Sequence, residues 1–86
     1  MAPLRKFTNA DARLLGDRLR VDWSRVDLEQ FRMGLEVELE HGLHDPSTNV
    51  TGDDPILTAK IALAHLKELP DYYTRLRAME AEAERS

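Results

Sequence analysis

The fold is decided by one stretch, residues 27–42, which reads DLEQFRMGLEVELEHG. It has the clearest helix start in the chain, because Asp27 is a good N-cap residue and Gln30 follows three residues later. Apolar residues then recur at helical spacing. We therefore predict a helix that runs to residue 40 or 41 and ends at Gly42 as its C-cap glycine.

Three further helices carry start or stop signals of the same kind: a capping box, a proline at the first helical position, or a proline that breaks a helix. They are expected from Asn9 to about Arg20, from Pro55 to Glu68 or Leu69, and from about Asp71 onward, after Pro70. The sequence shows no strand-like alternation. It predicts an all-α fold, a small bundle of three to four short helices in a single domain over residues 1–86. Residues 1–7 and about 81–86 are candidates for frayed tails.

The composition fits one small folded domain. A hydrophobic fraction of 42% with 33% charged residues is typical of soluble globular proteins. Domains of this size often gain stability from a disulfide, a metal ion or a partner subunit. Because the 86 residues include no cysteine, only the metal and the partner subunit are open to this chain.

The charge argues against nucleic acid as a partner. The formal net charge is −4, whereas phosphate binding needs a basic stripe. A local run of arginines is offset by neighbouring aspartates, namely Arg13, Arg18, Arg20 and Arg25 against Asp11, Asp17, Asp22 and Asp27. No apolar run approaches the roughly 18 residues of a membrane span, and the first residues lack the apolar stretch of a signal peptide. We expect a cytoplasmic protein that binds neither nucleic acid nor membrane.

Two of the predicted helices place Glu and His where apolar residues are expected. At about 100° per residue, Glu38 flanks the apolar face of its helix, and His41 follows three residues later. The helix over residues 55–68 is apolar almost all round, which is typical of a buried helix. His65 and Glu68 are then expected in the middle of its inner surface.

Antiparallel packing of these two helices would bring the two Glu/His pairs together, and three interpretations are open. In the first, which we favour, the pairs form a metal-free buried network in which Glu38 accepts from His65. In the second, two imidazoles and two carboxylates bind Zn, Fe or Mn, with Asp71 or Tyr72 as a further oxygen ligand. The third, acid–base catalysis, needs a pocket that no sequence feature indicates. Gly34 leaves room beside the pairs for a neighbouring backbone or a bound species.

Met33 and Val37 form a second apolar strip, which we interpret either as a subunit interface or as surface covered by the rest of the chain. No Walker loop, dinucleotide-binding glycine motif or nucleophile elbow is present, so the sequence leans away from an enzyme. The leading function is a binding or interaction module with a homo-oligomeric or protein partner. The alternative is a metal-binding protein with redox or hydrolytic chemistry.

Five segments carry a resemblance to known proteins: FRMGLEVELEHG at 31–42, NVT at 49–51, DDP at 53–55, KIALAHLKE at 60–68 and PDYYTRL at 70–76. Together they resemble a widespread family of small uncharacterised proteins from bacteria and their phages. The segments include both Glu/His pairs, Asp71 and Tyr72, so the resemblance implies a shared site. Because the family has no established activity, the resemblance implies no mechanism.

Overall fold

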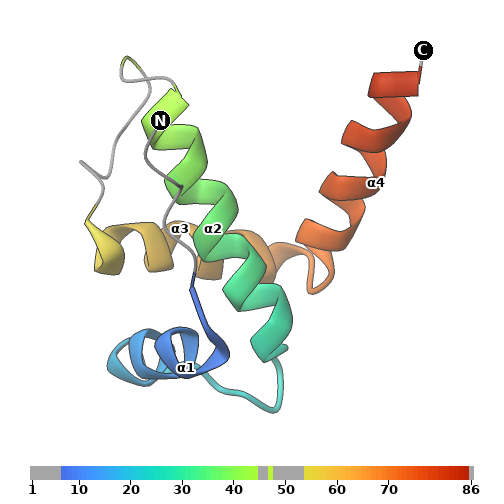
Figure 1. Ribbon diagram of the computed structural model, residues 1–86. Coiled ribbons are helices and arrows are strands. Elements are labelled where there is room, and N and C mark those ends of the chain that lie inside the picture. Colours follow the sequence, from blue (N-terminus) through green and yellow to red (C-terminus); the bar gives the residue numbers. More distant parts are fainter. Residues whose placement is uncertain (1–6, 45–46, 48–53, 86) are drawn as a thin grey trace.

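The computed structural model describes residues 7–44, 47 and 54–85, and at 41–44 and 85 it describes the backbone alone. Its helices are α1 (Asn9–Arg18), α2 (Leu28–His44), α3 (Pro55–Glu68) and α4 (Tyr72–Arg85). The described residues include no strand, which confirms the predicted all-α bundle. Figure 1 shows α1, α2 and α3 packed together, whereas α4 extends away from them towards its C-terminal end.

The predicted helix starts are confirmed by their side-chain hydrogen bonds. The Thr8 hydroxyl accepts from the Asp11 amide at 3.1 Å, and the Asp11 carboxylate accepts from the Thr8 amide at 3.1 Å, which completes a capping box. Asp27 accepts from the Gln30 amide at 3.0 Å. Asp54 accepts from two first-turn amides of α3 at 2.8 and 3.1 Å. Each cap satisfies backbone donors that have no partner within the helix.

The predicted end of α2 at Gly42 is wrong, because the helix continues to His44. A glycine inside a helix costs only about 1 kcal/mol relative to alanine, which an established helix tolerates. The next strong stop signal in the sequence is Pro46, which disfavours helical backbone at the residue before it. Helix α1 ends at Arg18 rather than at about Arg20.

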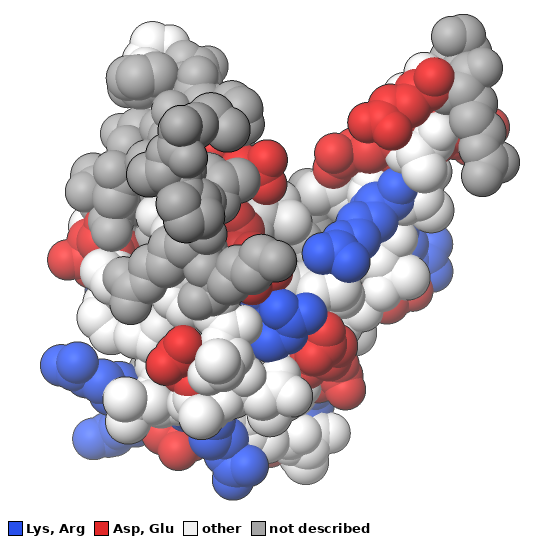
Figure 2. Space-filling view, in the orientation of Figure 1, with Lys and Arg blue, Asp and Glu red and all other residues white. Residues whose placement is uncertain are grey.

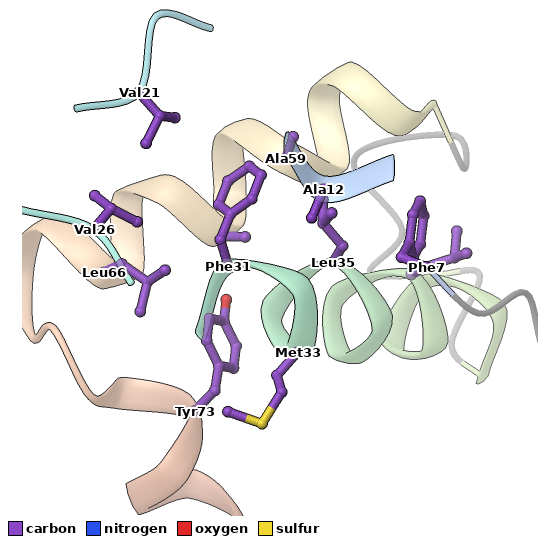
Figure 3. Close-up of a cluster of buried hydrophobic side chains, with 12 residues drawn as sticks. Phe7, Ala12, Val21, Val26, Phe31, Met33, Leu35, Ala59, Leu66 and Tyr73 are labelled. Carbon is purple, nitrogen blue, oxygen red and sulfur yellow. The ribbon is translucent and has the colours of Figure 1, made fainter. Parts of the chain in front are cut away.

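Helix α2 is the centre of the structure and packs against α1, α3 and α4. Phe31 and Leu35 on α2 are fully buried. Helix α3 buries small side chains, since Ala59 and Ala62 have no exposed surface, and Ala62 lies beside Gly34 of α2. The whole core, most of which Figure 3 labels, consists of Phe7, Ala12, Val21, Val26, Phe31, Met33, Leu35, Leu39, Ala59, Ala62, Leu66 and Tyr73.

Two glycines allow close approaches to α1 and α2. The Trp23 ring lies against Gly16 of α1 and meets Phe31 edge-on, with ring centroids 5.7 Å apart. A Cβ atom at Gly34 of α2 would lie 2.5 Å from the Tyr73 ring and 3.0 Å from the Ala62 Cβ. The missing side chain at Gly34 therefore lets α3 and the first turn of α4 close on the same point of α2.

We predict that Gly34→Ala destabilises the protein by about 1–3 kcal/mol, the usual cost of forcing extra atoms into a packed core. Alanine favours the helix by about 1 kcal/mol, but the buried Tyr73 ring has no free space into which to move. Urea denaturation followed by circular dichroism measures the change. A variant as stable as the wild type would show that the ring and helix α4 can shift.

Candidate functional site

A hollow of about 540 Å³ separates α4 from the C-terminal half of α2, and we call it the α2–α4 cleft. Its size falls within the range of about 300–1,000 Å³ that is typical of ligand pockets. In Figure 2 the cleft appears as the notch between α4 and the rest of the molecule. Its lining residues are Val37, Glu38, Glu40, His65, Tyr72, Leu76 and Glu80.

The base of the cleft contains a polar group of three side chains, one from each of α2, α3 and α4. The Tyr73 hydroxyl donates to Glu38 Oε2 at 2.9 Å. His65 Nε2 lies 3.6 Å from the same oxygen, a distance that suits an ion pair but is too long for a good hydrogen bond. The Glu38 side chain is only 15% exposed, so the hydroxyl of Tyr73 replaces much of the water that this carboxylate has lost.

Aromatic contacts hold this group in place. The His65 ring stacks on Tyr72 with ring centroids 4.5 Å apart and an angle of 5° between the planes. Tyr73 meets His65 edge-on at 6.2 Å and Tyr72 edge-on at 4.9 Å. The polarised ring edges favour these geometries, so the three rings fix the orientation of the imidazole and of the first turn of α4.

Tyr73 remains a hydrogen-bond donor over the whole physiological pH range. Burial raises the pKa of its phenol far above the ordinary value of 10.0, and the charge of the Glu38 carboxylate raises the pKa further. The phenol therefore stays neutral beside the carboxylate. This pair is a structural contact between α2 and α4, because the phenol of Tyr73 is not poised to release its proton near neutral pH.

Of the four predicted pair residues, the structure brings Glu38 and His65 together. Glu68 was expected in the middle of the inner face of α3, and this expectation is wrong because Glu68 is exposed. The inner face of α3 is set by Ala59, Ala62 and Leu66, so His65 lies at its edge and Glu68 outside it. The side chain of His41 lies outside the described residues.

The two weaker candidates have separate roles. Asp71 pairs with Arg75 at 2.8 Å on the surface, and Tyr72 provides the ring on which His65 stacks. Within the described side chains, no three Asp, Glu or His residues are grouped so that they could hold a metal ion. The metal interpretation therefore gains no support from the described residues.

The sequence reasoning missed Tyr73 as the donor to Glu38. Helix α4 restarts after Pro70, and the angle of this restart decides whether Tyr72 or Tyr73 points inward. A sequence signal was nevertheless available, since a carboxylate next to an apolar face needs a donor. For Met33 the structure decides between the two interpretations of the Met33/Val37 strip. Met33 is buried within its own chain, so only Val37 of the predicted strip lines an open surface.

Comparison with known proteins places this site within a family. The sequence model of a family of proteins of unknown function, DUF5661, matches residues 12–82. The chain belongs to the DUF5661 family. A search of curated proteins and a search of solved structures each found no match. The DUF5661 match includes the whole α2–α4 cleft, but membership assigns no chemistry to it.

No described helix of this DUF5661 protein is long and apolar enough to cross a lipid bilayer.

We predict that Tyr73→Phe lowers the free energy of unfolding by about 1–2 kcal/mol, because the mostly buried Glu38 carboxylate loses its hydroxyl donor. Tyr72→Phe is the matched control, since the Tyr72 hydroxyl makes no hydrogen bond among the described residues, and it should change stability by less than about 0.5 kcal/mol. Chemical denaturation of both variants tests the pair. Equal losses would mean that the hydroxyl contact contributes nothing.

The same contact predicts a loss of stability at alkaline pH. Because the pKa of Tyr73 is higher in the folded chain than in the unfolded chain, only unfolding releases this proton above the ordinary pKa. Below about pH 10 the protonated Tyr73 should make its full contribution to the free energy of unfolding. Above about pH 10 the free energy of unfolding should fall by about 1.4 kcal/mol per pH unit. Tyr73→Phe removes this slope and leaves the other titrations in place. Stability curves of wild type and variant that run parallel between about pH 9 and 11.5 would contradict the prediction.

Proposed function

We propose that this protein is an interaction module that binds a helical segment of a protein in the α2–α4 cleft. The observation that carries the proposal is the lack of cover on α4. Of its described side chains only Tyr73 is buried, whereas Tyr72 and Leu76 are half-buried and Met79 is 61% exposed. Isolated helices of about 12–15 residues are marginal in water, so a partner that covers α4 would stabilise it.

The chemistry of the cleft supports a protein segment as the ligand. Val37 on one side and Tyr72 and Leu76 on the other supply apolar walls. Aromatic and apolar side chains of this kind are typical of the centre of protein interfaces. Glu40 and Glu80 lie at the margin of the cleft, where their charges disfavour phosphate and other anions.

The Glu38, His65 and Tyr73 group has a positioning role in this proposal. It attaches the first turn of α4 to α2 and α3, while the remainder of α4 stays apart from α2. The width of the cleft therefore depends on these contacts and on the close approach at Gly34. A preformed groove reduces the ordering cost of binding.

The test uses a synthetic amphipathic peptide that presents leucines at helical spacing and is otherwise Ala and Gln, so that it carries no charge. Titrated into the labelled protein at about 50 µM, it should shift the NMR signals of Val37, Tyr72 and Leu76. Leu76→Asp should weaken binding at least about ten-fold, because a carboxylate would enter the apolar wall. Leu14→Asp is the control, since Leu14 lies on α1, outside the cleft, and is 65% exposed.

Signal shifts spread over the whole surface, or equal weakening by Leu76→Asp and Leu14→Asp, would contradict the cleft as the binding surface. Absence of any shift up to millimolar peptide would contradict the proposal as a whole.

A further inference from the structure

Helix α4 carries its charges in an order that does not stabilise an isolated helix. Arg75 and Arg77 lie in its first half, and Glu80, Glu82 and Glu84 lie in its second half, ahead of the terminal Arg85. The helix dipole favours the reverse order, with acidic residues near the N-terminus and basic residues near the C-terminus. Figure 2 shows this polarity on the visible face, with basic side chains nearer the start of α4 and acidic side chains nearer its end.

Contacts within the chain account for only part of this order, since the charge of Arg77 helps to lower the pKa of Glu29 on α2. Arg75 pairs with Asp71, but both side chains are at least half exposed, and exposed ion pairs contribute little to stability. Glu82 and Glu84 make no ion pair within the described part of the chain. The acidic half of α4 therefore has no electrostatic partner there.

The apolar residues of α4 form a single strip. Tyr72, Leu76, Met79 and Ala83 follow one another at spacings of four, three and four residues. This is the a/d spacing of a two-helix coiled-coil seam. Tyr72 and Leu76 also line the α2–α4 cleft, and both contribute with Met79 to a second, smaller hollow of about 140 Å³ on the other side of the strip. The strip thus lies open between two shallow depressions.

We infer that the helical segment bound at this surface is α4 of a second copy of the chain, running antiparallel. This inference rests on the proposed function and names its partner. An antiparallel arrangement places the basic half of each α4 beside the acidic half of the other. It also directs the two packed bodies, each formed by α1, α2 and α3, towards opposite ends of the helix pair.

One register satisfies both the apolar strip and the charges. When Leu76 lies opposite Met79 of the second copy, Tyr72 lies opposite Ala83, so that a large side chain meets a small one. In the same register Arg75 lies beside Glu82 of the second copy, and two-fold symmetry repeats this ion pair. The charge order that the isolated helix disfavours becomes complementary in the pair.

The test measures self-association of the full chain by sedimentation equilibrium from about 5 µM to about 1 mM. We expect a reversible dimer in the wild type. Glu82→Arg places Arg beside Arg75 of the second copy at two symmetric positions, and it should raise the dissociation constant at least about ten-fold. The double variant Arg75→Glu/Glu82→Arg exchanges the charges and should return to within about three-fold of the wild type. Ala81→Arg, on the opposite side of α4, is the control and should leave the dissociation constant unchanged.

Position 82 lies in the exposed part of α4, so these substitutions leave the core intact, and circular dichroism checks that the fold is retained. A double variant that fails to recover, or equal weakening by Ala81→Arg, would overturn the antiparallel register. A wild type that stays monomeric up to about 1 mM would overturn the second copy as partner. If such a monomer still bound the uncharged peptide in the cleft, the proposed interaction module would be retained and only the partner would be wrong. If the chain neither dimerised nor bound the peptide, both proposals would be overturned.

Discussion

The structure depends on the placement of one side chain, Tyr73, between three helices. Its ring is fully buried, lies against Gly34 of α2 and meets His65 of α3 edge-on. Its hydroxyl donates to Glu38, which gives a mostly buried carboxylate the donor that it needs. Together with the hydrogen bond that the Gln30 side-chain amide of α2 donates to the Thr74 hydroxyl, this contact attaches the first turn of α4 to α2. The contact therefore sets both the direction of α4 and the position of Glu38.

Attachment of α4 near its N-terminal end explains why the molecule has a cleft. Helix α4 is held by its first turn, and the residues beyond Leu76 are exposed. The C-terminal half of α2 and the exposed part of α4 then diverge, as Figure 1 shows, and Val37, Tyr72 and Leu76 form the walls between them. A small domain without cysteine has limited means to gain stability. A partner that covers α4 would supply part of the missing stability. The small core of this chain is therefore consistent with its proposed role in binding.

The polar residues singled out from the sequence turned out to divide between structure and surface. Glu38 and His65 do meet, as the antiparallel packing of α2 and α3 predicted. Glu68 is exposed, because the buried face of α3 is formed by Ala59, Ala62 and Leu66, and Ala62 is the residue that approaches Gly34 of α2. The small residues of this face carry little weight in a hydrophobicity pattern, so the pattern alone misplaced the inner face.

The sequence by itself determined where the helices begin. The caps at Thr8, Asp27 and Asp54 need only hydrogen bonds to residues two or three positions away, so local chemistry suffices. Tertiary structure alone decided which face of α3 is buried, and that Tyr73 rather than His65 is the hydrogen-bond donor to Glu38. These features depend on contacts between residues far apart in the chain, and the contacts form only when Gly34, Ala59 and Ala62 let the helices approach closely.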